Sequence, residues 1–186
     1  MAMPIRPLSL PTYTVDEIES WPDDGNRYEV LDGMLLVTPS PGMAHQLVAT
    51  ELAHVLAELL GPWPAVRVSA PGVIVLRPKT QLEPDILVFR PGPGRISWEG
   101  ADAHLLAVEV MSRSTRVYDR VYKRPAYLAL GVEEAWRVDP VERMVFVSRA
   151  GEPPDRPRKD VVEWRPSLLS VTLTIPLDRV FRGLPE

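Results

Sequence analysis

The segment Leu105–Met111 constrains the fold more than any other part of this chain. It reads Leu-Leu-Ala-Val-Glu-Val-Met, an apolar run that is interrupted only by Glu109. A run of this kind is typical of a central strand that is buried on both faces of a sheet. A carboxylate inside such a strand is costly unless a basic side chain or a metal ion balances its charge. The sequence therefore predicts a buried strand in which Glu109 has a cationic partner.

The elements around this strand predict a single α/β domain over residues 1–186, with a mixed sheet and helices packed on it. Residues 1–26 form an N-terminal helical extension that opens with a capping box at Thr14–Glu17. Residues 151–186 contribute C-terminal strands, after a polar, proline-rich excursion at Gly151–Lys159. The remaining expected elements are a hairpin around Asp32-Gly33, helices at Met43–Leu60 and Thr115–Leu130, and strands at Ala65–Ser69, Gly72–Leu76, Asp85–Phe89, Ala135–Val138, Met144–Val147 and Leu173–Ile175.

Composition and missing motifs exclude several classes of protein. The chain has no cysteine, which rules out disulfides, iron–sulfur clusters and thiol catalysis. Its net charge of −4 gives no global basic field. No apolar run approaches the roughly 20 residues of a membrane span, and we expect a cytoplasmic protein. The sequence lacks a phosphate-binding P-loop, a nucleophile elbow and a zinc-binding histidine pair.

A second carboxylate stands at the start of another apolar strand. Asp85 follows Pro84 directly and precedes Ile-Leu-Val-Phe. If this strand neighbours the strand of Glu109, the two carboxylates can approach one metal ion. Oxygen ligands without nearby histidine or cysteine ligands indicate Mg²⁺ or Mn²⁺. The alternative is that Glu109 pairs with an arginine and that Asp85 caps a turn.

Basic side chains follow on the next predicted helix. Asp119, Lys123 and Tyr127 lie four residues apart and share one helix face, provided that Pro125 does not break the helix. A basic stripe beside paired acids suits phosphodiester cleavage, because arginines hold the backbone and a lysine stabilises the developing charge. The alternative is a solvated helix with ordinary ion pairs. The candidate nucleic-acid-binding residues are Arg113, Arg116, Arg120 and Arg124.

Short motifs occur in a fixed order across residues 14–150. They are Arg27–Gly33, His45, Pro84-Asp85, Val108–Ser112, Ser114-Thr115, Asp119, Lys123, Tyr127 and Gly131–Trp136. This ordered set resembles the Uma-two family of candidate restriction endonucleases, a branch of the PD-(D/E)XK nuclease superfamily. The resemblance implies a restriction-endonuclease-like core, in which a central mixed β-sheet is flanked by helices.

The resemblance also implies roles for individual residues. Asp85 corresponds to the metal-binding aspartate of the superfamily and Glu109 to the acid of its second motif, with the Val110 carbonyl as a further ligand of Mg²⁺ or Mn²⁺. The chain departs from the superfamily pattern at Met111, where a lysine is expected. Lys123 on the following helix is the candidate replacement.

Three residues are candidates for auxiliary roles, and for Glu29 and His45 a structural role is an equal alternative. Glu29 would act as an auxiliary acid near the metal, His45 would contact substrate or relay a proton, and Asp119 would orient Lys123. The predicted function is a Mg²⁺-dependent endonuclease acting on DNA, with a two-fold dimer as a possible assembly. The alternatives are an inactive nuclease-fold binding or regulatory module, which Met111 favours, and a structural protein whose acids are all salt-bridged.

Overall fold

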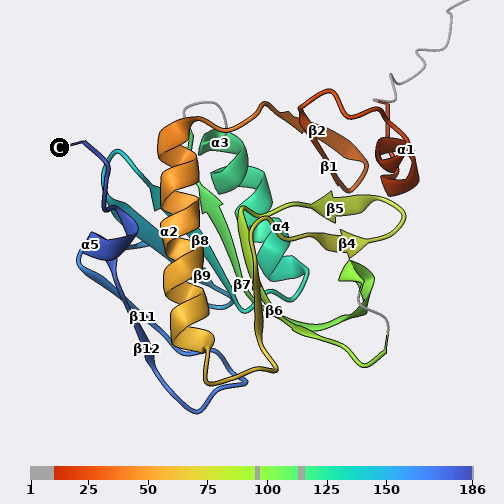
Figure 1. The fold of residues 1–186 in the computed structure, drawn as a ribbon. Coiled ribbons are helices and arrows are strands. Elements are labelled where there is room, and N and C mark those ends of the chain that lie inside the picture. The colour runs from red at the N-terminus through yellow and green to blue at the C-terminus, as the bar shows by residue number, and fades with distance from the viewer. Residues whose placement is uncertain (1–10, 95–96, 113–115, 186) are drawn as a thin grey trace, which may run out of the picture.

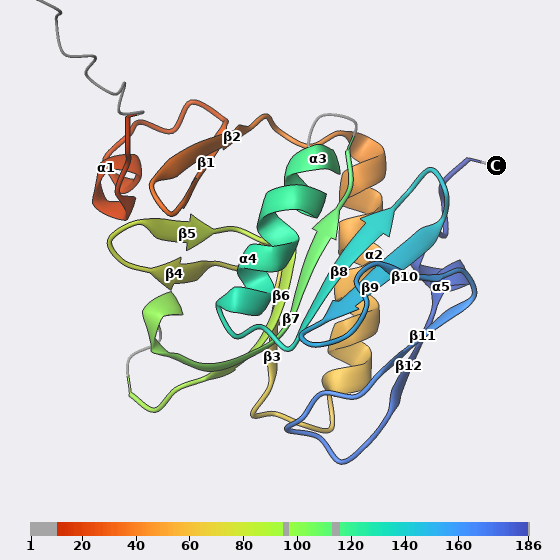
Figure 2. The same cartoon turned by 180° about the vertical axis from the view of Figure 1, so that it is seen from behind.

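A six-stranded mixed sheet forms the centre of the molecule (Figures 1 and 2). The computed structural model describes residues 11–94, 97–112 and 116–185. Strands β7 and β8 are parallel, whereas the neighbouring pairs β3–β6, β6–β7, β8–β9 and β9–β10 are antiparallel. In sheet order the strands are β10 (Arg156–Arg158), β9 (Met144–Arg149), β8 (Glu134–Asp139), β7 (Ala101–Val110), β6 (Ile86–Pro91) and β3 (Arg67–Ser69).

Strand β7 is the central, buried strand that its apolar sequence predicts. Its residues from Leu105 to Val110 are all buried, and β6 and β8 pair with it on either side. The strand begins at Ala101, four residues earlier than expected, because its polar first half pairs with the end of β6 through irregular register. Two register pairs matter for the site: Ile86 lies opposite Val108, and Glu109 lies beside Arg137.

Helices cover both faces of this sheet. Helix α2 (Met43–Leu60) crosses one face and buries Val48, Leu52 and Leu56 against it. Figure 1 shows α2 in front of the sheet, and Figure 2 shows α3 and α4 in front of the opposite face. The helical connection from β7 to β8 forms this second layer, as parallel neighbouring strands require a crossover. The predicted mixed sheet with helices packed on it is therefore confirmed.

The crossover is not the single regular helix that its spacing predicts. It consists of α3 (Arg116–Tyr118), a π-helical turn η2 (Asp119–Lys123) and α4 (Arg124–Ala129). Pro125 has no N–H and its ring disfavours a regular preceding turn, so it is accommodated in the first turn of α4. The N–H of Arg124 reaches back five residues to the carbonyl of Asp119, which marks the widened turn.

A smaller four-stranded antiparallel sheet stands beside the central one. Its order is β2 (Met34–Thr38), β1 (Arg27–Leu31), β5 (Thr80–Leu82) and β4 (Ile74–Leu76). The predicted Asp32-Gly33 hairpin joins β1 to β2, and both turn residues have positive φ, 49° and 84°. Strand β5 was not predicted, because three residues with two polar side chains give no apolar alternation. These strands carry Arg27 and Glu29 toward the centre of the molecule.

The two ends of the described chain add short elements. Helix α1 (Val15–Glu19) begins with the predicted capping box at Thr14. Strands β11 (Val161–Trp164) and β12 (Leu173–Pro176) form a separate pair, and helix α5 (Leu177–Val180) packs against α2. The expected excursion at 151–159 is exposed for most of its length, but its end forms the edge strand β10. In the described ranges, no helix combines the length and apolarity needed to cross a membrane.

Candidate active site

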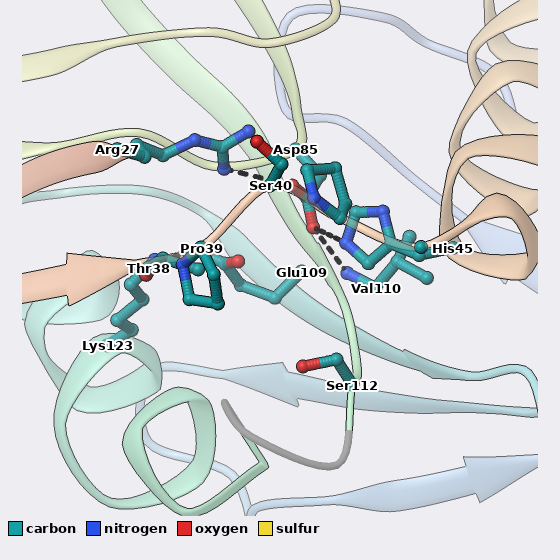
Figure 3. A pocket seen from close by; sticks show the side chains of 12 residues that line it. Arg27, Thr38, Pro39, Ser40, His45, Asp85, Glu109, Val110, Ser112 and Lys123 are labelled. Carbon is teal, nitrogen blue, oxygen red and sulfur yellow. Dashed lines mark hydrogen bonds and ion pairs between the residues drawn. The ribbon is translucent and has the colours of Figure 1, made fainter. Parts of the chain in front are cut away.

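A small pocket of about 100 Å³ lies at the end of β7, where both sheets and the start of α2 meet (Figure 3). The sequence of the central strands explains why acids meet here. Continuing the antiparallel register of Ile86 with Val108 places Asp85 beside Glu109. The structure therefore brings the two predicted carboxylates to one pocket. The charged or titratable residues lining it are Arg27, His45, Asp85, Glu109 and Lys123.

Asp85 is buried and both of its carboxylate oxygens have protein partners. Arg27 Nη1 donates to Oδ1 at 3.0 Å, and Oδ2 lies 2.9 Å from His45 Nε2. The backbone N–H of Val110 also donates to Oδ2 at 2.9 Å. Burial opposes ionisation, but His45, the Val110 N–H and Arg27 outweigh it and lower the pKa of Asp85. Asp85 is therefore a stable carboxylate at the pocket wall.

Lys123 lies between two buried carboxylates from different sheets. Its Nζ is 2.6 Å from Glu29 Oε2 and 3.1 Å from Glu109 Oε1. The side chains of Lys123, Glu29 and Glu109 are 4%, 0% and 6% exposed, respectively. Tyr127 donates a hydrogen bond to the same Glu109 oxygen. The two predicted helix residues, Lys123 and Tyr127, thus converge on one carboxylate across the π turn.

The charges of this cluster shift the protonation equilibria of its members in a consistent way. Burial raises the pKa of Glu109 well above its usual value despite the opposing attraction of Lys123, and repulsion by Asp119, Asp85 and Glu29 adds to the rise. Burial alone would lower the pKa of Lys123, but Glu109, Glu29 and Asp119 raise it. Lys123 is therefore a fixed cation, whereas Glu109 holds its negative charge at a cost. Asp119 is also buried, and its charge contributes to the pKa shifts of both Glu109 and Lys123.

Arg27 was missed as a site residue although its motif was noted. It alternates with Glu29 on β1, so both side chains leave the same face of that strand. Besides Asp85, Arg27 contacts the Glu83 carbonyl at 3.2 Å. Glu29 Oε1 accepts the N–H of Glu83 at 2.6 Å, which ties β1 to the segment leading into Asp85. The two-residue spacing of Arg27 and Glu29 in a strand was the available signal.

The donor atoms in the pocket suit Mg²⁺ or Mn²⁺. Asp85 and Glu109 supply carboxylate oxygens, and Val110 places its backbone at the same wall. Among the residues that the structure describes, no group of three or more histidine, cysteine, aspartate or glutamate side chains is arranged to hold a metal ion. Mg²⁺ commonly takes only one or two carboxylates and keeps water or substrate phosphate as its other ligands. The two carboxylates of Asp85 and Glu109 match this number of protein ligands.

In the described part of the chain, two members of the predicted arginine stripe form ion pairs with an aspartate and do not line the pocket. Arg113 lies outside the described residues, and Arg116 begins α3. Arg124 Nη1 donates to Asp155 Oδ2 at 2.9 Å, and Arg120 Nε lies 3.7 Å from the same oxygen. Sequence reasoning did not include Asp155, which belongs to a polar, proline-rich loop far along the chain. Arg120 and Arg124 thus each have an ion-pair partner, Asp155, within the protein itself.

Asp155 gives this arginine cluster a predictable response to acid. Burial opposes its ionisation, but Arg137 and Arg124 outweigh burial and lower the pKa of Asp155. A lowered pKa stabilises the fold above the unfolded-state pKa of about 3.9, and that contribution is lost as pH falls through the folded-state pKa. We expect the stability difference between the wild type and Asp155→Asn to be constant from pH 5 to 7 and to shrink below about pH 4.

Urea unfolding followed by circular dichroism from pH 3 to 7 measures this difference. Asp160→Asn, which alters an exposed aspartate nearby, is the control and should show little difference at any pH. A difference for Asp155→Asn that persists unchanged at pH 3 would contradict the assignment.

The mixed sheet with helices on both faces is a fold that is also found among solved structures. A crystal structure of a protein described as a “putative nuclease” of the DUF820 family, from Anabaena variabilis ATCC 29413, has the same fold. The two chains superpose with a TM-score of 0.75 at 22% sequence identity, over 90% of this chain and 97% of that one. No curated protein matches significantly.

The family follows from the sequence match. Residues 15–179 match the model of the Uma2 family, described as “Putative restriction endonuclease”. The chain therefore belongs to the Uma2 family, and the resemblance seen in its ordered motifs is confirmed.

Proposed function

We propose that this protein is a Mg²⁺-dependent endonuclease with a restriction-endonuclease-like core that hydrolyses phosphodiester bonds of DNA. The observation that carries the proposal is the pocket itself. Asp85 and Glu109 meet there on neighbouring strands, and Lys123 contacts Glu109 at 3.1 Å. Membership of a family described as restriction endonucleases supports the same reaction class.

In this proposal, Asp85, Glu109 and the Val110 carbonyl hold the cofactor. Mg²⁺ or Mn²⁺, when bound, supplies a Lewis acid that stabilises negative charge on phosphoryl oxygens. Arg27 and His45 fix the two oxygens of Asp85, so its carboxylate is oriented before any ligand arrives.

Lys123 supplies the positive charge that Met111 cannot. Its ammonium forms ion pairs with Glu29 and Glu109, and the Lys123 side chain also lines the pocket. In this proposal, a phosphoryl oxygen bound in the pocket lies beside this positive charge. A preorganised cation in a buried site stabilises developing charge more effectively than one in water. Glu29 and Tyr127 act as positioning residues for the pair of Lys123 and Glu109.

The inactive binding module is the second candidate, and one observation favours it. Both carboxylates have protein partners, because Arg27 and His45 hold Asp85 while Lys123 holds Glu109. A site satisfied in this way can persist for its structural value alone. Metal affinity and cleavage separate this candidate from the nuclease. If both DNA strands are cut together, a two-fold homodimer is the assembly that this activity favours.

Calorimetric titration of Mn²⁺ tests the metal site without any assumption about DNA sequence. We expect the wild type to bind Mn²⁺. The affinity of Asp85→Asn for Mn²⁺ should be at least about tenfold lower, because a carboxylate ligand is removed. Asp160→Asn is the matched control, since it removes an exposed carboxylate of the same type. Circular dichroism verifies that Asp85→Asn remains folded.

Cleavage completes the test. Supercoiled plasmid DNA should be nicked or linearised by the wild type with Mg²⁺ or Mn²⁺ and left intact by Asp85→Asn. No Mn²⁺ binding at millimolar concentration, repeated with duplex DNA present to complete the coordination shell, would rule out the nuclease in favour of the binding module.

A further inference from the structure

Three arginines, from η2, α4 and β8, converge on one carboxylate outside the pocket. Arg137 on β8 places Nη2 2.8 Å from Asp155 Oδ1. Arg124 Nη1 is 2.9 Å from Asp155 Oδ2, and Arg120 Nε is 3.7 Å from the same oxygen. In the described ion pairs, three guanidinium groups thus share the carboxylate of Asp155.

The most buried of these arginines has further contacts, but they carry no negative charge. Arg137 is 7% exposed, and its Nη1 donates to the sulfur of Met111 at 3.1 Å. Its guanidinium carbon lies 5.1 Å from the centre of the Phe146 ring. Neither contact balances the positive charge of Arg137. In the described ion pairs, its acidic partner is Asp155. A buried arginine whose described acidic partner is shared with two other arginines is a candidate site for a further anion.

The cluster adjoins the proposed catalytic residues. Arg124 directly follows Lys123 in the chain, and Arg137 pairs with Glu109 in the register of β7 and β8. Paired residues in neighbouring strands project from the same face of a sheet. Met111, which Arg137 contacts, lies two residues beyond Glu109. An anion held by these arginines is therefore beside the pocket, on the face of the sheet that faces α4.

Asp155 is attached to the periphery of the fold. It precedes the three-residue edge strand β10, and its backbone N–H donates to Ser148 Oγ at 3.0 Å. Its φ of 58° is a left-handed conformation that aspartate tolerates better than most residues. The preceding residues 151–154 are exposed. Short, exposed edge elements open more readily than core strands, so Asp155 can leave while the arginines stay in place.

We propose that Arg120, Arg124 and Arg137 form a binding site for a phosphate of the nucleic-acid backbone, and that Asp155 occupies this site until the phosphate replaces it. The inference rests on the proposed function, because it assigns the substrate contact beside the same pocket. Guanidinium groups bind carboxylate and phosphate oxygens with similar fork geometry, which makes the exchange chemically direct. Asp155 keeps the buried charge of Arg137 compensated in the free protein.

Binding of duplex DNA in EDTA tests this exchange without metal or cleavage. We expect Asp155→Asn to tighten binding of a fluorescein-labelled 20-base-pair duplex by about tenfold in fluorescence anisotropy, because the competing carboxylate charge is gone. The slope of log affinity against log salt should steepen by about one phosphate contact. Glu152→Gln is the matched control, since it removes one negative charge from the same loop away from Arg124 and Arg137.

A second pair of variants keeps the test decisive if Asp155→Asn does not fold. Arg124→Gln should weaken duplex binding by about tenfold. Its control, Arg156→Gln, removes an exposed arginine that pairs with Glu152 and should change binding less than twofold. A phosphate site also predicts that inorganic pyrophosphate raises the melting temperature of Asp155→Asn more than that of Glu152→Gln.

The outcomes separate this inference from the nuclease proposal. Equal effects of Asp155→Asn and Glu152→Gln would show general electrostatics and overturn the phosphate site. Unchanged or weaker binding by folded Asp155→Asn, or normal binding by Arg124→Gln, would show that the cluster only joins α4, β8 and the loop before β10. Loss of cleavage in Asp85→Asn with normal duplex binding would support the metal site independently.

Discussion

Replacing Lys123 with methionine is expected to lower the free energy of unfolding by about 3–5 kcal/mol and to reduce DNA cleavage at least about a hundredfold. The stability loss follows from burial, because Glu29 and Glu109, which are both almost fully buried, lose their shared cation. The loss of cleavage follows from removal of the positive charge beside the pocket. Urea unfolding at pH 7 and initial rates of plasmid cleavage measure the two effects.

Two controls isolate the buried charge of Lys123. Lys159→Met removes an exposed lysine and should change stability by less than about 0.5 kcal/mol. Glu29→Gln added to Lys123→Met should recover part of the lost stability, because one uncompensated buried carboxylate disappears, but it should not restore cleavage. If Lys123→Met is as stable as Lys159→Met, the two short contacts of Lys123 do not stabilise the fold.

Replacing Glu109 with glutamine is expected to abolish cleavage, with a loss of at least about a hundredfold, while raising the free energy of unfolding by about 1 kcal/mol. Glutamine keeps an oxygen that accepts the hydrogen bonds of Tyr127 and Lys123. It removes a buried negative charge whose pKa is raised by burial and by repulsion from nearby acids. Lys123 retains Glu29 as its partner, so no cation is left unpaired.

The test is whether Lys123→Met lowers the free energy of unfolding while Glu109→Gln raises it. Unfolding of Glu109→Gln and Lys123→Met in the same buffer, with a Mn²⁺ titration of Glu109→Gln, measures stability and metal affinity together. Glu163→Gln, on the exposed face of β11, is a matched control and should be neutral. Retained cleavage by Glu109→Gln would remove Glu109 from the catalytic site, and a large destabilisation would mean that its charge is required by the fold.

The sequence predicts the elements whose side chains alternate or repeat strongly. Strand β7 was predictable because its apolar run is long, and α2 because its apolar residues recur over eighteen positions. Strand β5 was not, because three residues carry too little pattern. The π turn was not, because a wider turn changes the hydrogen-bond register without changing residue types. Local sequence constrains an element only where its own length supplies the signal.

The site follows the same rule. Asp85 and Glu109 were predictable as partners, because acids at the ends of apolar strands stand out against their neighbours. The arginine partner of Asp85 was harder to predict, since Arg27 comes from another sheet and lies 58 positions from Asp85. Asp155 was not predictable, because its loop is rich in polar residues and only the tertiary fold brings it to Arg137. Contacts between distant segments carry the information that periodicity lacks.

The widened helical turn has a consequence for comparing members of the Uma2 family. One residue in an α-helix corresponds to a rotation of about 100°, so a one-residue insertion that is absorbed as a π bulge leaves the flanking helices in place. The number of residues between Glu109 and its lysine is therefore not fixed by the geometry of the pocket. A relative that lacks the bulge can present a lysine from a neighbouring helical position, and matching by column would then align the wrong residue with Lys123.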